Sequence, residues 1–232
     1  MSREQIISVL SGIIKEGSIV TTGVASPLPL LAIRLAQLSK DFTYLNCIGA
    51  VDPKIKESTY SSVTKYALEN KNSELKLESI WDYANRGLID LMFFGASQVD
   101  SKGNVNITCI GDYSSPRVKL PGPAAAISLR KTVKKGIIVI PKHSKRVFVE
   151  KLDFLTSPNV GNTIVVTNLC IFELGNEPKL VSVHPGHTLE EVKENTGFEF
   201  AVPKELNETP SPTQSEIESI NKLDNNKVLG RL

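Results

Sequence analysis

The chain alternates between segments with helical hydrophobic spacing and short runs of β-branched or apolar residues, and this alternation restricts its fold more than any other feature. Helical spacing over 6–14 precedes a strand-like run at 18–22, and helical spacing over 30–38 precedes a short strand at 43–47. Helices and strands in alternation favour parallel strands joined by right-handed crossovers. The sequence therefore predicts an α/β fold with an open, mostly parallel sheet and flanking helices.

The remaining segments are assigned by the same patterns. The apolar run Leu88–Phe94 predicts a buried strand that ends at Gly95. Thr188 and Glu191 have the spacing of a capping box, which predicts a short helix that stops at Gly197. Further strands are predicted at 136–140, 146–149, 164–167, 170–174 and 179–183, with a hairpin turn at 176–178 between the last two.

Two segments do not fit this alternation. The polar stretch 51–77 has no clear period and is predicted to be a loop with marginal helix, either a lid or an interface segment. From Pro203 the chain is proline-rich and polar, with one weak helical window at 217–223. We therefore predict an α/β domain over 1–202 and an extended C-terminal arm, with a short helix, over 203–232.

Composition excludes several classes of protein. Lys and Arg number 27 against 25 Asp and Glu, a formal net charge of +2, which gives no field that would favour nucleic acid or an anionic membrane. Cys47, Cys109 and Cys170 are odd in number and far apart, so they predict neither a disulfide framework nor a metal knuckle. No apolar run approaches the roughly 18 residues of a membrane span, and no signal-peptide pattern is seen. We expect a cytoplasmic protein.

The loop after the buried strand is the first candidate site. In open α/β sheets ligands bind at the carboxyl ends of strands, which is where Gly95 lies. Gln98, Asn104 and Asn106 follow, and their amides suit an uncharged polar ligand or a thioester carbonyl. The alternative is a structural hairpin, because residues 100–103 are a good turn sequence.

A second candidate is the small-residue stretch 120–128, which has the pattern of a loop that enters a helix. Backbone N–H groups around Gly122, Ala124 and Ala125 would suit a phosphate, a carboxylate or an oxyanion. Tight packing of the alanines is the alternative. The histidines at 143, 184 and 187 lack a third ligand at a spacing that would complete a zinc site, so we predict no metal.

The two loops, in this order, make the chain similar to a known family. It resembles the B subunit of glutaconate CoA-transferase and other family I CoA-transferases, and the resemblance extends to about Val202. It implies a fold of the NagB, RpiA and CoA-transferase type and an obligate A-type partner subunit, usually as an A2B2 heterotetramer. It also implies a coenzyme A thioester as substrate and no permanently bound cofactor. The segments that carry the resemblance are 94–100, 103–113, 145–158, 184–186 and 191–198.

The chain departs from these transferases at two places. In the family, a glutamate at the end of the second strand attacks the acyl-CoA and becomes a glutamyl-CoA thioester. The matching position here is Asn46 or Cys47, so the carboxylate is missing. An amide cannot form the mixed anhydride, and Cys47 is either a nucleophile or a small apolar strand residue. The second departure lies at Ala124 and Ala125, where glutaconate CoA-transferase has a glycine-rich run and where methyl groups restrict the backbone.

The segments 146–150 and 181–186 are also similar to the B subunits of steroid ring-opening CoA-thioester hydrolases. In that branch the A subunit supplies the catalytic carboxylate and water is the nucleophile. The sequence thus leaves three hypotheses: a CoA-transferase-like B subunit that lacks the nucleophilic glutamate, a hydrolase B subunit, and a non-catalytic homologue that binds CoA esters. Arg130 and the lysines near it are candidates to contact CoA phosphates, with a solvated surface as the alternative.

Overall fold

The computed structural model of the 232-residue chain describes residues 2–65 and 69–232. The chain divides into two compact units. Unit 1 comprises Met1–Phe94, Thr132–Gly136 and Pro212–Leu232, and unit 2 comprises Gly95–Lys131 and Ile137–Ser211. Among the described residues, none of the helices reaches the length and apolar content that a membrane crossing requires.

Unit 1 is built on strands in the order β5-β1-β2-β3-β4. Strand β1 pairs in parallel with both β5 and β2, whereas β3 and β4 add to the edge as antiparallel strands. The elements are α1 (Ser2–Ile13), β1 (Ile19–Thr22), α2 (Pro27–Ala36), β2 (Thr43–Leu45), β3 (Ala50–Val51), β4 (Ser73–Glu74), α4 (Leu77–Asn85), β5 (Leu91–Gly95), α7 (Gln214–Leu223) and the 3-10 turn η1 (Leu229–Arg231).

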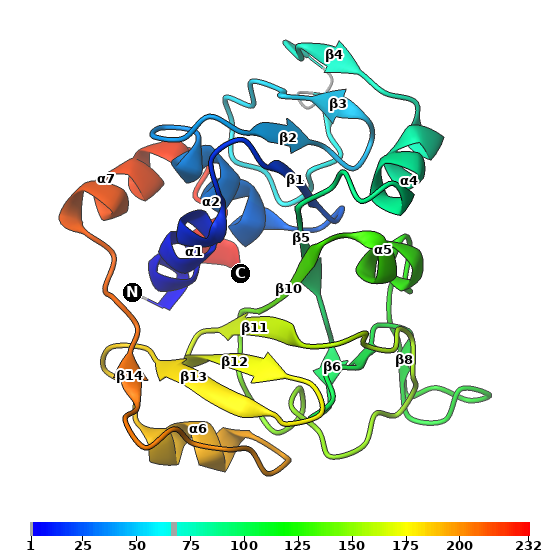
Figure 1. The fold of residues 1–232 in the computed structure, drawn as a ribbon, viewed down its shortest axis with the longest axis vertical. Helices are drawn as coiled ribbons and strands as arrows, with labels where there is room; N and C mark the ends of the chain where they lie inside the picture. The colour runs from blue at the N-terminus through cyan, green and yellow to red at the C-terminus, as the bar shows by residue number, and fades with distance from the viewer. Residues whose placement is uncertain (1, 66–68) are drawn as a thin grey trace. The chain divides into compact units, whose positions relative to one another are not determined.

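The crossover from β1 to β2 runs through α2, as the alternating pattern predicts. A proline at the first helical turn suits α2, because its missing N–H would have had no partner there. Nearly all of the α2 side chains are buried, since α1 and α7 pack against it (Figure 1). Pro27 and Arg34 are the exceptions, and the Arg34 guanidinium donates hydrogen bonds to the carbonyl oxygens of Leu223 at 2.9 Å and Lys56 at 3.1 Å.

Unit 2 holds the strand order β10-β11-β12-β13-β14 and two separate hairpins, β6-β7 and β8-β9. Strands β10 and β11 are parallel, β11 to β13 are antiparallel, and the short β14 returns parallel to β13. The elements are β6 (Gln98–Val99), β7 (Val105–Asn106), β8 (Cys109–Ile110), β9 (Val118–Lys119), α5 (Ala126–Thr132), β10 (Lys135–Ile140), β11 (Thr163–Thr167), β12 (Cys170–Leu174), β13 (Lys179–Val183), α6 (Leu189–Asn195) and β14 (Asn207–Glu208).

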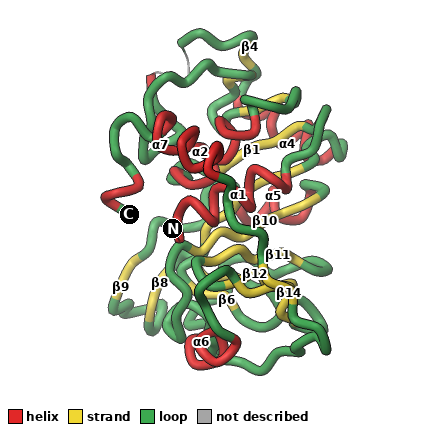
Figure 2. Tube along the Cα trace, turned by 90° about the vertical axis from the view of Figure 1, so that its left-hand side faces the viewer, coloured by secondary structure: helices red, strands yellow, loops and turns green. Residues whose placement is uncertain are grey.

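The core of unit 2 is centred on aromatic rings. Phe148 and Phe172 are fully buried, and the His143 imidazole stacks on Phe148 with ring centroids 3.8 Å apart. Helix α6 (Figure 2) contributes Val192 to the same core. Its amino terminus is capped by the Thr188 side chain, which accepts a hydrogen bond from the backbone N–H of Glu191. The predicted helix and its Thr188 cap are therefore confirmed, whereas the Glu191 carboxylate pairs with His187.

The structure confirms the α/β class and most of the predicted strands, including 170–174 and 179–183 with their original limits. The predicted strand at 146–149 is wrong. The N–H groups of Val147 and Phe148 both donate to the carbonyl oxygen of Ser144 at 2.9 Å, so the backbone turns there. Phe148 makes only an isolated bridge to Val99. The apolar residues at 146–149 have the pattern of a strand. The reason for the apolar pattern is that Phe148 is buried in the core.

The C-terminal segment contains more regular structure than an extended arm. Helix α7 has a complete capping box formed by Thr213 and Glu216, and it begins three residues before the predicted window. The boundary at residue 202 remains a prediction.

Of the polar stretch 51–77, residues 66–68 lie outside the described residues, and β3 and β4 are the only strands in its described remainder.

Unit 2 contains two buried histidines, so the pH dependence of its free energy of unfolding tests whether their imidazoles are neutral in the folded core. Burial lowers the pKa of His143 to about 3 and that of His184 to about 4. In the unfolded chain both return to about 6.5, so below that pH the unfolded state binds protons that the folded state does not. We expect the free energy of unfolding to fall between pH 6.5 and 5 by up to about 1.4 kcal/mol per pH unit for each histidine.

Urea unfolding followed by circular dichroism at pH 7, 6 and 5 measures this slope. The matched control is His187→Asn, since His187 is partly exposed and pairs with Glu191 at 2.8 Å. That variant should retain the slope, and His184→Asn should flatten it. A free energy of unfolding that is constant over this range would contradict the assignment of two neutral, buried imidazoles.

Candidate functional site

The carboxyl ends of β1 and β2 lie side by side in unit 1, because the parallel register places Thr21 opposite Leu45. Strand β2 ends at Leu45, so Asn46 and Cys47 stand in the turn that leads to β3. Carboxyl ends of parallel strands are where ligands bind in open α/β sheets. The sequence-predicted position for the nucleophile therefore falls in a tight turn at this edge.

Asn46 is completely buried and its amide is occupied by the protein itself. Its Nδ2 donates to the Ser62 carbonyl oxygen at 2.9 Å and to the Tyr44 hydroxyl at 3.2 Å, and its Oδ1 accepts from the N–H of Ile48 at 3.0 Å. A buried amide needs such partners. Asn46 therefore holds the turn after β2 and the segment around Ser62 together.

Cys47 is half-buried, and its Sγ lies 3.3 Å from the Ser62 Oγ. Burial raises the pKa of this thiol above its ordinary value. Because the thiolate is the nucleophilic form of cysteine, a neutral thiol is a poor attacking group. Among the described residues, the hydrogen-bond partners of Cys47 include neither the base nor the cation that activates a nucleophilic cysteine.

Two residues of this site were not found from the sequence. Ser62 is 1% exposed and belongs to the polar stretch that has no period, so nothing in its local pattern distinguishes it from the other serines. Its backbone N–H donates to the Val24 carbonyl at 2.8 Å, which ties the stretch to the segment after β1. Tyr44 is a fully buried strand residue whose burial raises its pKa, and its apolar neighbours concealed the polar role of its hydroxyl.

The loop 95–106 is a hairpin in unit 2, as the structural alternative predicts. Strands β6 and β7 pair antiparallel, and the Gly103 N–H donates to the Asp100 carbonyl at 2.9 Å. Asn104 closes the turn, since its Nδ2 donates to Asp100 Oδ2 at 2.9 Å and its Oδ1 accepts from the Asn159 N–H at 2.8 Å. The Asn104 amide is therefore engaged within the turn.

Gln98 and Asn106 are both buried and face each other across the hairpin, with Asn106 Nδ2 donating to Gln98 Oε1 at 2.8 Å. Asn106 Nδ2 also donates to the Cys109 carbonyl, and the Gln98 oxygen accepts from the Asp153 N–H. These contacts give both side chains a structural use. Gly95, the last residue of β5, is exposed and open around its Cα.

Arg130 contacts the protein backbone. Its guanidinium, which is largely buried, donates to the carbonyl oxygens of Gly103 at 2.8 Å and Ser157 at 3.1 Å. Burial lowers its pKa to about 10, so it stays protonated at neutral pH. Lys134 is paired with Asp90 at 2.8 Å. Both cations therefore have partners within the chain.

The second loop has a backbone conformation that favours glycine. Gly122 has φ +88°, and its N–H donates to the Ile107 carbonyl at 2.8 Å. Ala124 has φ 43°, in the left-handed region, although it carries a methyl group. Ala125 and then α5 follow. The loop at 122–125 therefore contains two residues in the left-handed region, one of which carries a methyl group.

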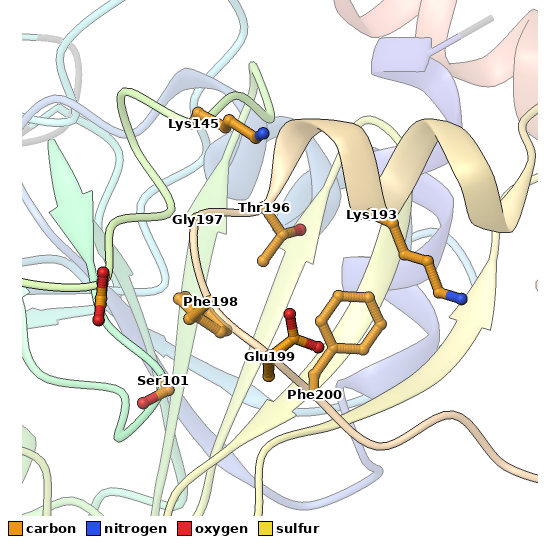
Figure 3. A pocket seen from close by; sticks show the side chains of 9 residues that line it. Ser101, Lys145, Lys193, Thr196, Gly197, Phe198, Glu199 and Phe200 are labelled. Carbon is orange, nitrogen blue, oxygen red and sulfur yellow. The ribbon is translucent and has the colours of Figure 1, made fainter.

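Unit 2 also contains a hollow of about 890 Å³, to which the segment after α6 contributes most of the lining (Figure 3). Its charges are mixed, with Lys145 and Lys193 opposed by Glu150 and Glu199. Gly197 is required at this place, because a Cβ on it would lie 2.4 Å from the Phe148 carbonyl oxygen. None of the side chains predicted from the sequence lines this hollow. No group of three or more potential metal ligands gathers within residues 2–65 and 69–232.

The α/β fold agrees with a comparison of families. The sequence pattern of the coenzyme A transferase family matches residues 3–195. The chain belongs to the coenzyme A transferase family, so the resemblance inferred from its motifs is confirmed.

Among individual proteins, the chain is 34% identical to the B subunit of 3-oxoadipate CoA-transferase from Pseudomonas knackmussii, over 91% of this chain and 88% of that protein. It is 26% identical to the cholesterol ring-cleaving hydrolase IpdB subunit of Rhodococcus jostii, over 88% and 84% of the two chains. The crystal structure of the decarboxylase AibA/AibB aligns with a TM-score of 0.95 and 34% identity, covering 100% of this chain and 98% of that one. That decarboxylase is also known as four variants in which one cysteine is replaced.

The occupied amide of Asn46 predicts that Asn46→Ala is strongly destabilising. The substitution leaves the buried Ser62 carbonyl and Ile48 N–H without their side-chain partner, and each unsatisfied group costs about 1–3 kcal/mol. We expect the free energy of unfolding in urea to fall by about 2–4 kcal/mol. The control is Asn221→Ala, an exposed position on α7, which should change it by less than about 0.5 kcal/mol. Equal effects of the two substitutions would show that the Asn46 amide does not hold the turn.

The left-handed conformation of Ala124 predicts opposite effects for two neighbouring glycine substitutions. Ala124→Gly removes the steric cost of the methyl group and should raise the free energy of unfolding by up to about 1 kcal/mol. Ala125→Gly gains no such relief and should lower it by about 0.5–1 kcal/mol. Urea denaturation of the two variants beside the wild type compares them directly. Destabilisation by both would show that position 124 carries no strain.

Proposed function

We propose that this chain is the B subunit of a two-subunit enzyme that transforms acyl-CoA thioesters without forming a covalent bond between the substrate and this chain. The observation that carries the proposal is the turn after β2, where the position of the transferase nucleophile holds a fully hydrogen-bonded amide, Asn46, and a neutral thiol, Cys47. Neither group forms the anhydride on which glutamyl-CoA chemistry depends.

The partner in this proposal is an A-type subunit, in an A2B2 assembly. The relatives support a partner, because AibA/AibB is a complex of two named subunits and IpdB is named as a subunit. The substrate is a CoA thioester and no cofactor is permanently bound. Gly95, Gln98, Asn104 and Asn106, with Gly122, Ala124 and Ala125, remain candidates for the substrate pocket. Because the polar side chains of this set are hydrogen-bonded within the chain, the backbone groups at Gly95 and Gly122 are the better candidates to contact the substrate.

Hydrolytic ring opening is one reaction that needs no nucleophile on this chain. Water attacks a ring carbonyl carbon while a carboxylate on the A subunit removes its proton, the adjacent ring carbon–carbon bond breaks, and the released carbanion takes up that proton. The similarity to the IpdB subunit over most of both chains favours this candidate. The B subunit would shape the pocket and exclude bulk water.

Decarboxylation is the second candidate, and the match to the decarboxylase AibA/AibB over the whole chain favours it. In an acyl-CoA that carries a suitably placed carboxylate, the bond to CO2 breaks and its electron pair moves into the thioester enolate, which is then protonated. The reaction needs a pocket that desolvates the carboxylate and stabilises the enolate oxygen, and no attack by a side chain. A non-catalytic homologue that binds CoA esters is the remaining alternative.

The test is to co-express the chain with its A subunit and incubate the complex with glutaconyl-CoA and with a CoA thioester that carries a cyclic ketone, with and without acetate as acceptor. Mass spectrometry of the CoA esters and measurement of released CO2 distinguish the reactions. A CoA ester that gains water or loses CO2 without acceptor supports the proposal. Formation of acetyl-CoA only when acetate is present would contradict it, as would the absence of any binding of either ester.

Replacement of Cys47 supplies a second prediction. Removal of a true nucleophile lowers kcat by about 10⁴-fold or more, whereas a group that only lines the site contributes far less. We expect the complex that carries Cys47→Ala to retain kcat within about tenfold of the wild type. Loss of more than about 10⁴-fold, with unchanged circular dichroism, would identify Cys47 as the attacking group.

A further inference from the structure

The Ser62 hydroxyl has three polar neighbours but only one proton. Its Oγ lies 2.8 Å from the Gly23 carbonyl oxygen, 3.0 Å from the Val24 carbonyl oxygen and 3.3 Å from the Cys47 Sγ. Carbonyl oxygens only accept hydrogen bonds, so a contact of 2.8 Å between two oxygens requires the hydroxyl proton between them. The proton of Ser62 is therefore directed to these carbonyls.

Gly23 is the better acceptor of the two. Each carbonyl oxygen already accepts one other hydrogen bond, Gly23 from the Thr22 hydroxyl at 3.0 Å and Val24 from the Ser62 N–H at 2.8 Å. The contact of the Ser62 hydroxyl is shorter to Gly23, at 2.8 Å against 3.0 Å. With the hydroxyl proton committed to backbone oxygen, Ser62 Oγ can meet the Cys47 sulfur only with a lone pair. The proton in the contact between them must then be the thiol proton of Cys47.

We propose that Ser62 is a positioning residue, which accepts the thiol proton of Cys47 and so holds Cys47 as a neutral thiol with its S–H directed to the Ser62 Oγ. Ser62 is itself held in place, because its carbonyl oxygen accepts a hydrogen bond from the Asn46 side chain at 2.9 Å. The chemical consequence rests on the proposed function: a thiol held in this way neither attacks the thioester nor donates a proton to it.

The electrostatic surroundings agree with a neutral thiol. Burial raises the pKa of Cys47, whereas a hydrogen bond donated by Ser62 to the sulfur would lower it. In the arrangement proposed here, the hydrogen bond stabilises the protonated thiol and therefore acts in the same direction as burial. The titratable neighbour is Tyr44, which burial keeps protonated throughout the neutral range. The Asp52 carboxylate accepts a hydrogen bond from the backbone N–H of Tyr44 at 2.7 Å. No cation is recorded as an interaction partner of Cys47 among the described residues.

The direction of a pKa change tests which group donates. The full-length chain in its complex is alkylated with iodoacetamide from pH 6.5 to 10.5 without substrate, and peptide mass spectrometry follows Cys47 apart from Cys109 and Cys170. If Ser62 accepts the thiol proton, Ser62→Ala removes an interaction that stabilises the neutral form. The pKa of Cys47 then falls, and alkylation at pH 7.5 accelerates by about threefold or more, relative to the plateau rate at high pH.

If Ser62 instead donates to the sulfur, the same substitution raises the pKa and slows alkylation, which would overturn the proposal. The plateau rate separates a change in access from a change in ionisation. Ser61→Ala is the matched control, because Ser61 contacts Val24 and Val63 but not Cys47, and it should leave the profile unchanged. An equal shift in both variants would also overturn the proposal.

A spectroscopic measurement on the unsubstituted protein covers the case in which Ser62→Ala does not fold. The infrared difference between wild type and Cys47→Ala at neutral pH should contain the S–H stretching band of a hydrogen-bonded thiol. Absence of an S–H band, or the position of a thiol without an acceptor, would contradict the assignment. Both measurements are made without substrate, so their failure is distinguishable from failure of the proposed function.

Discussion

The hydrogen bond from the Asn46 side chain to the Ser62 carbonyl is the contact on which the candidate site depends. It joins the turn after β2 to a polar stretch that has little regular structure of its own. Because Asn46 is completely buried, this bond cannot be exchanged for one to water without a substantial cost. The position of Ser62, and through it the state of Cys47, follows from this one buried amide.

The same contact gives the residue at this turn a structural use in a chain of the coenzyme A transferase family. A glutamate at this turn would have to keep one carboxylate free for attack, whereas Asn46 satisfies three backbone or hydroxyl groups. Asn46 therefore uses its whole amide group to stabilise the turn and leaves no polar atom free for catalysis. In the proposed function, the covalent part of the reaction moves to the partner subunit or is absent.

How far the sequence predicts the structure depends on whether the information is local. Strands β12 and β13 were predicted to the residue because each has apolar alternation and they are separated by a turn sequence. The segment 146–149 has a similar pattern, but a carbonyl contact from Ser144 and burial of Phe148 turn it into a loop. The hairpin at 98–106 was predictable from its turn residues. Ser62 was not, since its role depends on Gly23, Val24 and Cys47, which are distant in sequence.

The central claim is that this chain forms no covalent intermediate, and the intact mass of the chain during turnover tests it most directly. The complex with the A subunit is mixed with excess 3-oxoadipyl-CoA and quenched in acid within the first turnovers. The intact mass of its B chain is then measured by mass spectrometry. The account predicts a B-chain mass identical to that of the untreated protein at every time point. A mass increase equal to the acyl group or to coenzyme A, located on a peptide that contains Asn46 and Cys47, would contradict it.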